Sequence, residues 1–200
     1  MTTKKSLAIK LSKLSSFSNP QMQLEQYTTP SELAATLLHH AHMIDAFTDK
    51  HVADLGCGPG ILGIGAGILG AKKVTFLDVD QQAISDLQTN LNDFSFTHEI
   101  IHSPLKAINA DIVVMNPPFG TKRRHADKQF VLAAMQSAPV IYSIHLAGSE
   151  NFLDEVAARK GFVRTHDWHF SFALPATMQA HTKRRTDIEV VAIRFEQQRL

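Results

Sequence analysis

The stretch DIVVMNPPFGTK, residues 111–122, decides the fold of this chain of 200 residues. It opens with apolar residues typical of a buried strand and passes at once into an amide, two prolines, an aromatic ring and a glycine. Two consecutive prolines cannot continue a central strand, because each lacks the N–H group that a β-ladder needs. The chain therefore leaves the sheet here, with Asn116 and Phe119 displayed at the carboxyl end of the strand. In open α/β sheets this edge is where ligands bind.

Residues 116–119 offer two hydrogen-bond acceptors beside a ring. Asn116 supplies a side-chain carbonyl, Pro117 a backbone carbonyl with no local N–H in competition, and Phe119 a flat aromatic surface. Such a set suits a planar group that carries an NH2. The alternative is purely structural, namely a tight turn out of the strand with a buried phenylalanine.

A second motif lies upstream, where a predicted strand at 52–55 runs into the glycine loop Gly56-Cys-Gly58-Pro-Gly60 and then a helix. Glycines at this junction let backbone N–H groups approach a ligand closely at a helix N-terminus. The spacing differs from the dinucleotide fingerprint, and no Lys-Ser/Thr pair follows as in a P-loop. Because Asp54 precedes the loop, the pattern favours a ligand with a positive charge.

The strand predicted over 73–77 ends at Asp78, about 20 residues past the glycine loop. A carboxylate in this place can accept hydrogen bonds from both hydroxyls of a ribose. Asp80 then precedes an apolar-periodic stretch and is the expected N-cap of the next helix.

Periodicity along the rest of the chain indicates an α/β domain. Helices are expected at about 3–15, 31–47, 61–70, 81–94, 127–137 and 149–160, and strands at 52–55, 73–77, 99–102, 112–115, 140–145, 162–172 and 188–195. Thr29 and Ser31 are the expected N-caps of helix 31–47, which places Leu33, Leu37 and Ile44 on one face. The series predicts a seven-stranded, mostly parallel sheet that ends in an antiparallel hairpin. We expect a single domain, 1–200, with an N-terminal helical extension (1–47) and a catalytic core (48–200).

Composition excludes several classes of protein. The chain is 44% hydrophobic, enough for a sizeable core, yet it has no apolar stretch of the about 18 residues that a membrane span needs. The single cysteine, Cys57, excludes an internal disulfide and a cysteine-based zinc site. His39, His40 and His42 are expected at the surface and not at a metal. With no signal peptide apparent after Lys4 and Lys5, we expect a cytoplasmic protein without membrane contact.

The net charge of +1 conceals clusters of cations. One cluster directly follows the Asn-Pro-Pro-Phe element and another lies near the end of the chain: Lys122, Arg123, Arg124, Lys183, Arg184 and Arg185. Clustered cations suit the phosphates of a nucleic acid, and solvated surface charge is the alternative for each cluster.

Five motifs in order resemble one known family. Residues 116–119 resemble the catalytic motif of S-adenosylmethionine-dependent amino-methyltransferases, and residues 54–60 resemble their cofactor-binding motif. With residues 25–30 (EQYTTP), 142–145 (YSIH) and 187–190 (DIEV), the order and spacing are similar to small-subunit ribosomal RNA adenine-N6 methyltransferases of the methyltransferase-like protein 5 type and their archaeal relatives. The resemblance runs from about Leu11 to Phe195.

This resemblance implies a Rossmann-like class I methyltransferase fold that uses S-adenosylmethionine to methylate the N6 amine of adenosine in RNA. The implied catalytic residues are Asn116, Pro117, Pro118 and Phe119. The implied cofactor-binding residues are Gln26, Tyr27, Thr29, Asp54, Gly56, Gly58, Gly60, Asp78, Ser103 and Asn116. Relatives often have an acidic residue where this chain has Ser103, and a serine hydroxyl accepts a hydrogen bond less strongly than a carboxylate. The basic clusters become the expected RNA contacts, and a small zinc-binding activator protein becomes a possible partner.

Alternatives stay open at this point. A protein glutamine-N5 methyltransferase uses a similar Asn-Pro-Pro element, usually ending in Tyr where this chain has Phe119. A non-catalytic RNA-binding module would keep the fold, although the intact glycine loop, Asp78 and Asn116 argue against it. His145 also matches a family position, and it is either close to the target nucleotide or a hydrogen-bonded histidine at a strand end.

Overall fold

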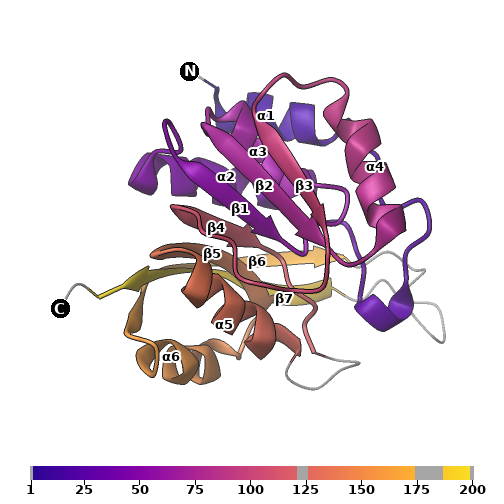
Figure 1. Cartoon of the computed structure of the whole chain (residues 1–200). Helices are drawn as coiled ribbons and strands as arrows, with labels where there is room; N and C mark the ends of the chain where they lie inside the picture. Colours follow the sequence, from indigo (N-terminus) through magenta and orange to yellow (C-terminus); the bar gives the residue numbers. More distant parts are fainter. Residues whose placement is uncertain (1, 121–125, 174–186, 199–200) are drawn as a thin grey trace.

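A twisted seven-stranded sheet forms the centre of the molecule (Figure 1). Its strands are β1 (His51–Leu55), β2 (Lys73–Asp78), β3 (His98–His102), β4 (Ile112–Met115), β5 (Val140–Leu146), β6 (Phe162–Ala173) and β7 (Asp187–Gln197). The computed structural model describes residues 2–120, 126–173 and 187–198. The strand order is β3-β2-β1-β4-β5-β7-β6, with the first five strands pairing in parallel and β7 antiparallel to both β5 and β6. The predicted seven-stranded, mostly parallel sheet with an antiparallel hairpin is therefore confirmed.

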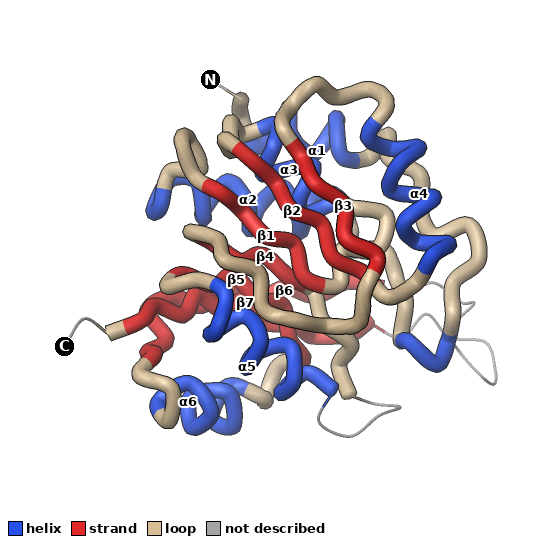
Figure 2. Tube along the Cα trace, in the orientation of Figure 1, coloured by secondary structure: helices blue, strands red, loops and turns tan. Residues whose placement is uncertain are grey.

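Helices cover both faces of this sheet (Figure 2). They are α1 (Lys4–Leu11), α2 (Ser31–Asp45), α3 (Ile61–Ile68), α4 (Gln81–Leu91), α5 (Ala126–Ser137) and α6 (Glu150–Ala158), and one 3-10 turn, η1 (Met22–Leu24), precedes α2. The first four helices share one apolar cluster with one face of the sheet, and α5 and α6 share another with the opposite face. No helix in the described part of the chain has the length and apolar character to cross a bilayer.

The central strands bury both faces, which explains their uninterrupted apolar sequences. All four residues of β4 are buried, and β1 pairs with β2 on one side and with β4 on the other. The strand order therefore reverses direction at β1 and β4. Crevices form at such a switch point, outside the carboxyl ends of the strands. Both motifs identified in the sequence, the glycine loop after β1 and residues 116–119 after β4, leave the sheet at this point.

The structure corrects four local predictions. Helix α1 ends at Leu11 and α2 at Asp45, each shorter than its apolar periodicity suggests. Neither Thr29 nor Ser31 caps α2, because Pro30 is in the N-cap position with no side-chain hydrogen bond. Ile44 is 40% exposed and lies outside the core.

A part-buried ion pair fastens α2 to the sheet. The guanidinium of Arg194 on β7 donates from Nε and Nη2 to the two carboxylate oxygens of Asp45, over 2.7 and 2.8 Å. The hydroxyl of Tyr142 on β5 donates to the same carboxylate. Because Asp45 ends α2, this bidentate contact fixes the helix against two strands and with it the position of the segment that leads into α2.

Candidate functional site

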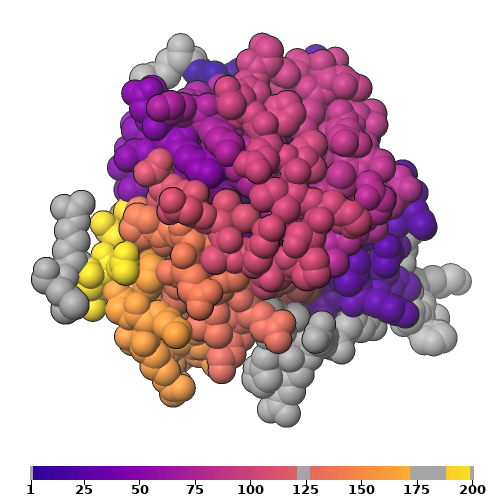
Figure 3. Space-filling model, in the orientation of Figure 1, coloured from indigo at the N-terminus to yellow at the C-terminus, as the bar shows by residue number. Residues whose placement is uncertain are grey.

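A cavity of about 650 Å3 opens at the switch point of the sheet. Figure 1 shows the arrowheads of β1 and β2 pointing toward this edge, with η1 beyond them. The walls of the cavity come from five parts of the chain: the covering segment (residues 12–30), the glycine loop, the end of β2 with the loop after β3, the turn after β4 with Asn116 and Pro118, and Gln129 with Phe130 of α5. In Figure 3 the violet surface of the covering segment adjoins the pink surface around α4. One cavity thus joins both sequence motifs.

The glycine loop is built to present backbone to this cavity. Gly58 has a φ of +53°, and a Cβ there would lie 2.6 Å from Cζ of Phe17, so a side chain is excluded by conformation and by space. The N–H of Gly58 donates to Asp78 Oδ2 over 2.8 Å, and the N–H groups of Gly56 and Cys57 donate to the carbonyl of Leu77. These bonds tie the loop to the end of β2 and fix its distance from the ligand space.

Two carboxylates, Asp54 and Asp78, line the cavity beside the glycine loop. Asp54 is 1% exposed, and burial raises its pKa to about 7, assisted by the negative charge of Asp78. Its Oδ2 accepts the N–H of Gly63 in α3 over 2.7 Å. Burial also raises the pKa of Asp78. Two nearby carboxylates stabilise a positive charge, and the part-buried Asp78 keeps lone pairs for hydroxyl donors.

At the other end of the cavity, Asn116 is held by the covering segment. The hydroxyl of Tyr27 donates to Asn116 Oδ1 over 3.0 Å, and Asn116 Nδ2 donates to Thr29 Oγ1 over 2.8 Å. The ring of Tyr27 lies 5.1 Å from that of Phe119, measured between centroids. Gln26 is instead tied to the start of α4, because its Nε2 donates to Asp80 Oδ2 over 2.8 Å. Thr29 lies one residue before the N-cap Pro30, and its hydroxyl accepts from Asn116.

The cavity brings together most of the predicted site. Its lining includes Gln26, Tyr27, Thr29, Asp54, Gly56, Gly58, Asp78, Ser103, Asn116 and Pro118. Three predicted residues are not part of the lining: Gly60 starts α3 beneath the loop, Pro117 is buried, and Phe119 packs against Tyr27. Ser103 donates its N–H to the carbonyl of Asp78 over 3.0 Å and its hydroxyl to the carbonyl of Pro104 over 3.1 Å.

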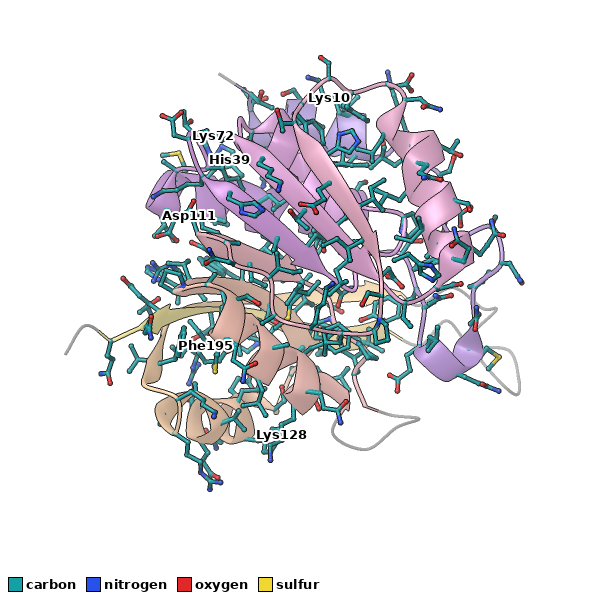
Figure 4. All side chains as sticks on the ribbon, in the orientation of Figure 1. Lys10, His39, Lys72, Asp111, Lys128 and Phe195 are labelled. Atoms are coloured by element: carbon teal, nitrogen blue, oxygen red, sulfur yellow. The ribbon has the colours of Figure 1, made fainter. Side chains whose placement is uncertain are left out.

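The two predicted RNA-binding clusters, Lys122–Arg124 and Lys183–Arg185, lie outside the described residues. Of the lysines labelled in Figure 4, Lys128 lies on α5, whereas Lys10 lies at the far end of the molecule, on α1.

Sequence reasoning missed two aromatic residues that line the cavity. Phe17 covers Gly58, and Phe130 of α5 lies where a Cβ on Gly56 would stand, 2.7 Å from its Cε1. An isolated aromatic residue in a linker rich in Ser and Asn was the available signal for Phe17.

His145, near the carboxyl end of β5, is buried and does not line the cavity. Its Nε2 and the hydroxyl of Ser143 are 2.6 Å apart, while its Nδ1 has no hydrogen-bond partner within the described ranges. Burial lowers the pKa of the imidazole to about 3, so the ring is neutral at physiological pH. The prediction of a hydrogen-bonded histidine at a strand end therefore holds for Nε2 but not for Nδ1.

Comparisons with known proteins agree with this geometry. A family model described as the methyltransferase small domain matches residues 31–140, more than half of the chain. The chain is 32% identical over 203 residues to a Danio rerio protein named rRNA N(6)-adenosine-methyltransferase METTL5, a match that covers 92% of this chain and 94% of that protein. It is also 30% identical over 192 residues to the Drosophila melanogaster protein of that name, with 90% of each covered.

Among solved structures, a crystal structure of a candidate RNA methyltransferase from Pyrococcus horikoshii matches with a TM-score of 0.92 and 42% identity, over 98% of both chains. Identities of 30–42% over at least 90% of this chain indicate membership of one family and not only a shared fold. The chain therefore belongs to the methyltransferase small domain family, alongside the relatives named rRNA N6-adenosine-methyltransferases.

Proposed function

We propose that this protein transfers a methyl group from S-adenosylmethionine to the N6 amine of adenosine in ribosomal RNA. The observation that carries the proposal is that Asn116 lines the same cavity as Asp54, Gly58 and Asp78. A donor site and an acceptor site are thereby adjacent, as direct methyl transfer requires. The names of the relatives that match over nearly the whole chain supply the acceptor, adenosine in rRNA.

The donor set fits this cofactor. Asp78 would accept the ribose hydroxyls, and the buried carboxylate of Asp54 would stabilise the positive charge of the ligand. Ser103 and Leu105 line the same end of the cavity, where they would contact the adenine ring. When bound, S-adenosylmethionine would supply the electrophilic methyl group, and the residues of this chain would bind and orient the reactants.

The acceptor residues act by orientation. The lone pair of an adenine N6 amine is delocalised into the ring, so the free amine is a poor nucleophile. Hydrogen bonds from the amine to Asn116 Oδ1 and to the carbonyl of Pro117 would favour a more pyramidal nitrogen and direct its lone pair at the methyl group. Phe119 would stack on a base that has been extruded from its helix. Such a reaction needs no strong base.

Finer features belong to the same proposal. We take the target to be small-subunit rRNA, with the clusters Lys122–Arg124 and Lys183–Arg185 binding the flanking phosphates. A small zinc-binding activator protein is the proposed partner, and the cytoplasm the proposed location. We also propose that residues 1–200 act as one domain, with extension 1–47 and core 48–200, because Leu7 and Leu37 share an apolar cluster with Val52 and Val114.

Cofactor binding should depend on pH through Asp54. Its pKa of about 7 without ligand falls when a cationic ligand binds, because the positive charge favours the carboxylate. Affinity is therefore full above about pH 7.5 and weakens up to about tenfold per pH unit below pH 7, with protons released on binding. Calorimetry at pH 6 in buffers of different ionisation enthalpy measures this release. Asp54→Asn should abolish it, and an unchanged release in that variant would contradict the assignment.

The decisive experiment for the proposal is methyl transfer from labelled S-adenosylmethionine. Ribosomal subunits, naked rRNA and ribosomal proteins are offered as acceptors, and the products are digested to nucleosides or amino acids. N6-methyladenosine is the expected product. Label in glutamine would instead favour the protein methyltransferase alternative. Cofactor binding without methyl transfer, even with an activator protein present, would favour the non-catalytic RNA-binding module.

A further inference from the structure

The covering segment contacts the side chain at the centre of the acceptor site from both sides. Tyr27 and Thr29 are 89 and 87 residues distant from Asn116 in sequence, yet each makes one hydrogen bond to its carboxamide. From this geometry we propose that Tyr27 and Thr29 form an amide clamp, which holds Asn116 with its oxygen available to the substrate amine. This inference rests on the proposed function and assigns two positioning residues to it.

Orientation of the amide decides whether Asn116 can work at all. A carboxamide presents an acceptor on one side and a donor of almost the same shape on the other, so a half-turn exchanges them. With its oxygen toward the substrate, Asn116 accepts an amine hydrogen, whereas with its NH2 in that place two donors would oppose each other. A free asparagine side chain samples both states, because its last torsion is broad and roughly two-fold.

The two hydroxyls of the clamp are chemically unequal, and this inequality selects one orientation. A phenol is more acidic than an aliphatic alcohol, so Tyr27 is the better donor and Thr29 the better acceptor. Burial raises the pKa of the Tyr27 phenol, which therefore keeps its proton and donates to Oδ1. Thr29, only 5% exposed, takes the Nδ2 hydrogen. A carbonyl oxygen has two lone pairs, so Oδ1 keeps one for the substrate.

The clamp is fixed to the body of the protein. Gln26, next to Tyr27, donates to Asp80, whose N–H donates to Asp78 Oδ1 over 2.9 Å. Further along the covering segment, the N–H of Ser15 donates to Asn90 Oδ1 over 2.8 Å, and the N–H of Ser18 to Asp86 Oδ2 over 2.9 Å. Because these bonds attach the covering segment to α4, the hydroxyls of Tyr27 and Thr29 are already in place before substrate binds. No binding energy is then needed to order them.

The clamp predicts a loss in kcat without a loss in cofactor affinity. Tyr27→Phe keeps the ring beside Phe119 and removes only the hydroxyl, and Thr29→Val keeps the shape and removes only the acceptor. We expect each variant to lower kcat about 10- to 100-fold, below the range for direct loss of a hydrogen-bonding group, because the amide still spends part of its time correctly oriented. The Kd for S-adenosylmethionine should stay within about twofold in both variants, since neither removes a charge from the cofactor end. Thr29→Ser should restore most of the rate lost in Thr29→Val.

Thr36→Val is the matched control, because the Thr36 hydroxyl donates to the carbonyl of Glu32 within α2 and does not line the cavity. Two results would overturn the clamp. If Tyr27→Phe raised the Kd for S-adenosylmethionine and left kcat unchanged, the Tyr27 hydroxyl would contribute to cofactor binding and not to the orientation of Asn116. If Tyr27→Phe lowered the KM for RNA and did not lower kcat, its hydroxyl would compete with the substrate for Asn116.

A measurement without turnover separates the clamp from the proposed function. In protein labelled with 15N at asparagine, the side-chain amide of Asn116 should exchange its hydrogens slowly in the wild type and faster in Thr29→Val and Tyr27→Phe. Equal exchange in the three proteins would reject the clamp, whatever acceptor the enzyme methylates. Slow exchange with no N6-methyladenosine formed would keep the clamp and reject the adenosine assignment.

Discussion

Replacing Asn116 with alanine is expected to lower the rate of methyl transfer about a thousandfold while the Kd for S-adenosylmethionine changes little. The substitution removes the acceptor for the substrate amine and, with it, the partner of Tyr27 and Thr29. Loss of one hydrogen-bonding group directed at developing charge typically costs about 100- to 1,000-fold in kcat. Single-turnover kinetics at saturating cofactor, with Kd from calorimetry, measures the two effects separately.

The control is Asn151→Ala, the same change at an exposed residue of α6 on the other face of the sheet. Asn116→Asp is informative as well, because a carboxylate keeps an acceptor but cannot donate to Thr29. We expect it to retain more activity than Asn116→Ala. An Asn116→Ala protein with more than about a tenth of the wild-type rate would contradict the role of this side chain in orienting the amine.

Replacing Asp78 with alanine is expected to raise the Kd for S-adenosylmethionine about 100-fold or more. The carboxylate accepts the N–H groups of Gly58 and Asp80 over 2.8 and 2.9 Å, and it is the proposed acceptor for the ribose hydroxyls. Hydrogen bonds to charged groups contribute about 1.5–3 kcal/mol each, and about 1.4 kcal/mol corresponds to tenfold in Kd. Removing the carboxylate also leaves two backbone donors without this acceptor, one in the glycine loop (Gly58) and one at the start of α4 (Asp80), which loosens the end of the cavity proposed for S-adenosylmethionine.

Calorimetric titration measures this effect, with thermal unfolding recorded alongside to detect loss of the fold. Asp93→Ala, at an exposed position just after α4, is the matched control. Asp78→Asn keeps an acceptor for the Gly58 N–H and should bind more tightly than Asp78→Ala. A folded Asp78→Ala protein with wild-type affinity would remove Asp78 from the cofactor site.

Local patterns were sufficient to predict the fold. Strand β4 is found where the apolar residues before the double proline placed it, and Asp80 caps α4 by accepting the N–H of Gln82. Such features depend on neighbours a few residues away, so they are visible in the sequence. Helix ends were less certain: the periodicity of α1 extends past Leu11, although the chain turns there.

Sequence periodicity could not predict side-chain contacts between segments that are far apart in the chain. Thr29 has the residue type and spacing of a helix cap, but its hydroxyl instead bonds to Asn116. Arg194 looks like one polar residue in an apolar strand until α2 brings Asp45 against it. In both cases the partner lies on another element, and only the packed structure selects one hydrogen bond among several that the residue could make.

The glycine loop also contains a chemical reporter. Cys57 is the single cysteine of the chain, it is 7% exposed, and it is one of the residues that line the cavity. Burial, together with the carboxylates of Asp54 and Asp78, raises the pKa of its thiol, so the thiolate that reacts with alkylating reagents is scarce at neutral pH. The unmodified protein is therefore expected to be alkylated slowly, at a rate that depends on how far reagent can reach Cys57 from the cavity. Ligand occupancy can be followed by the slowing of that reaction, without introducing any label.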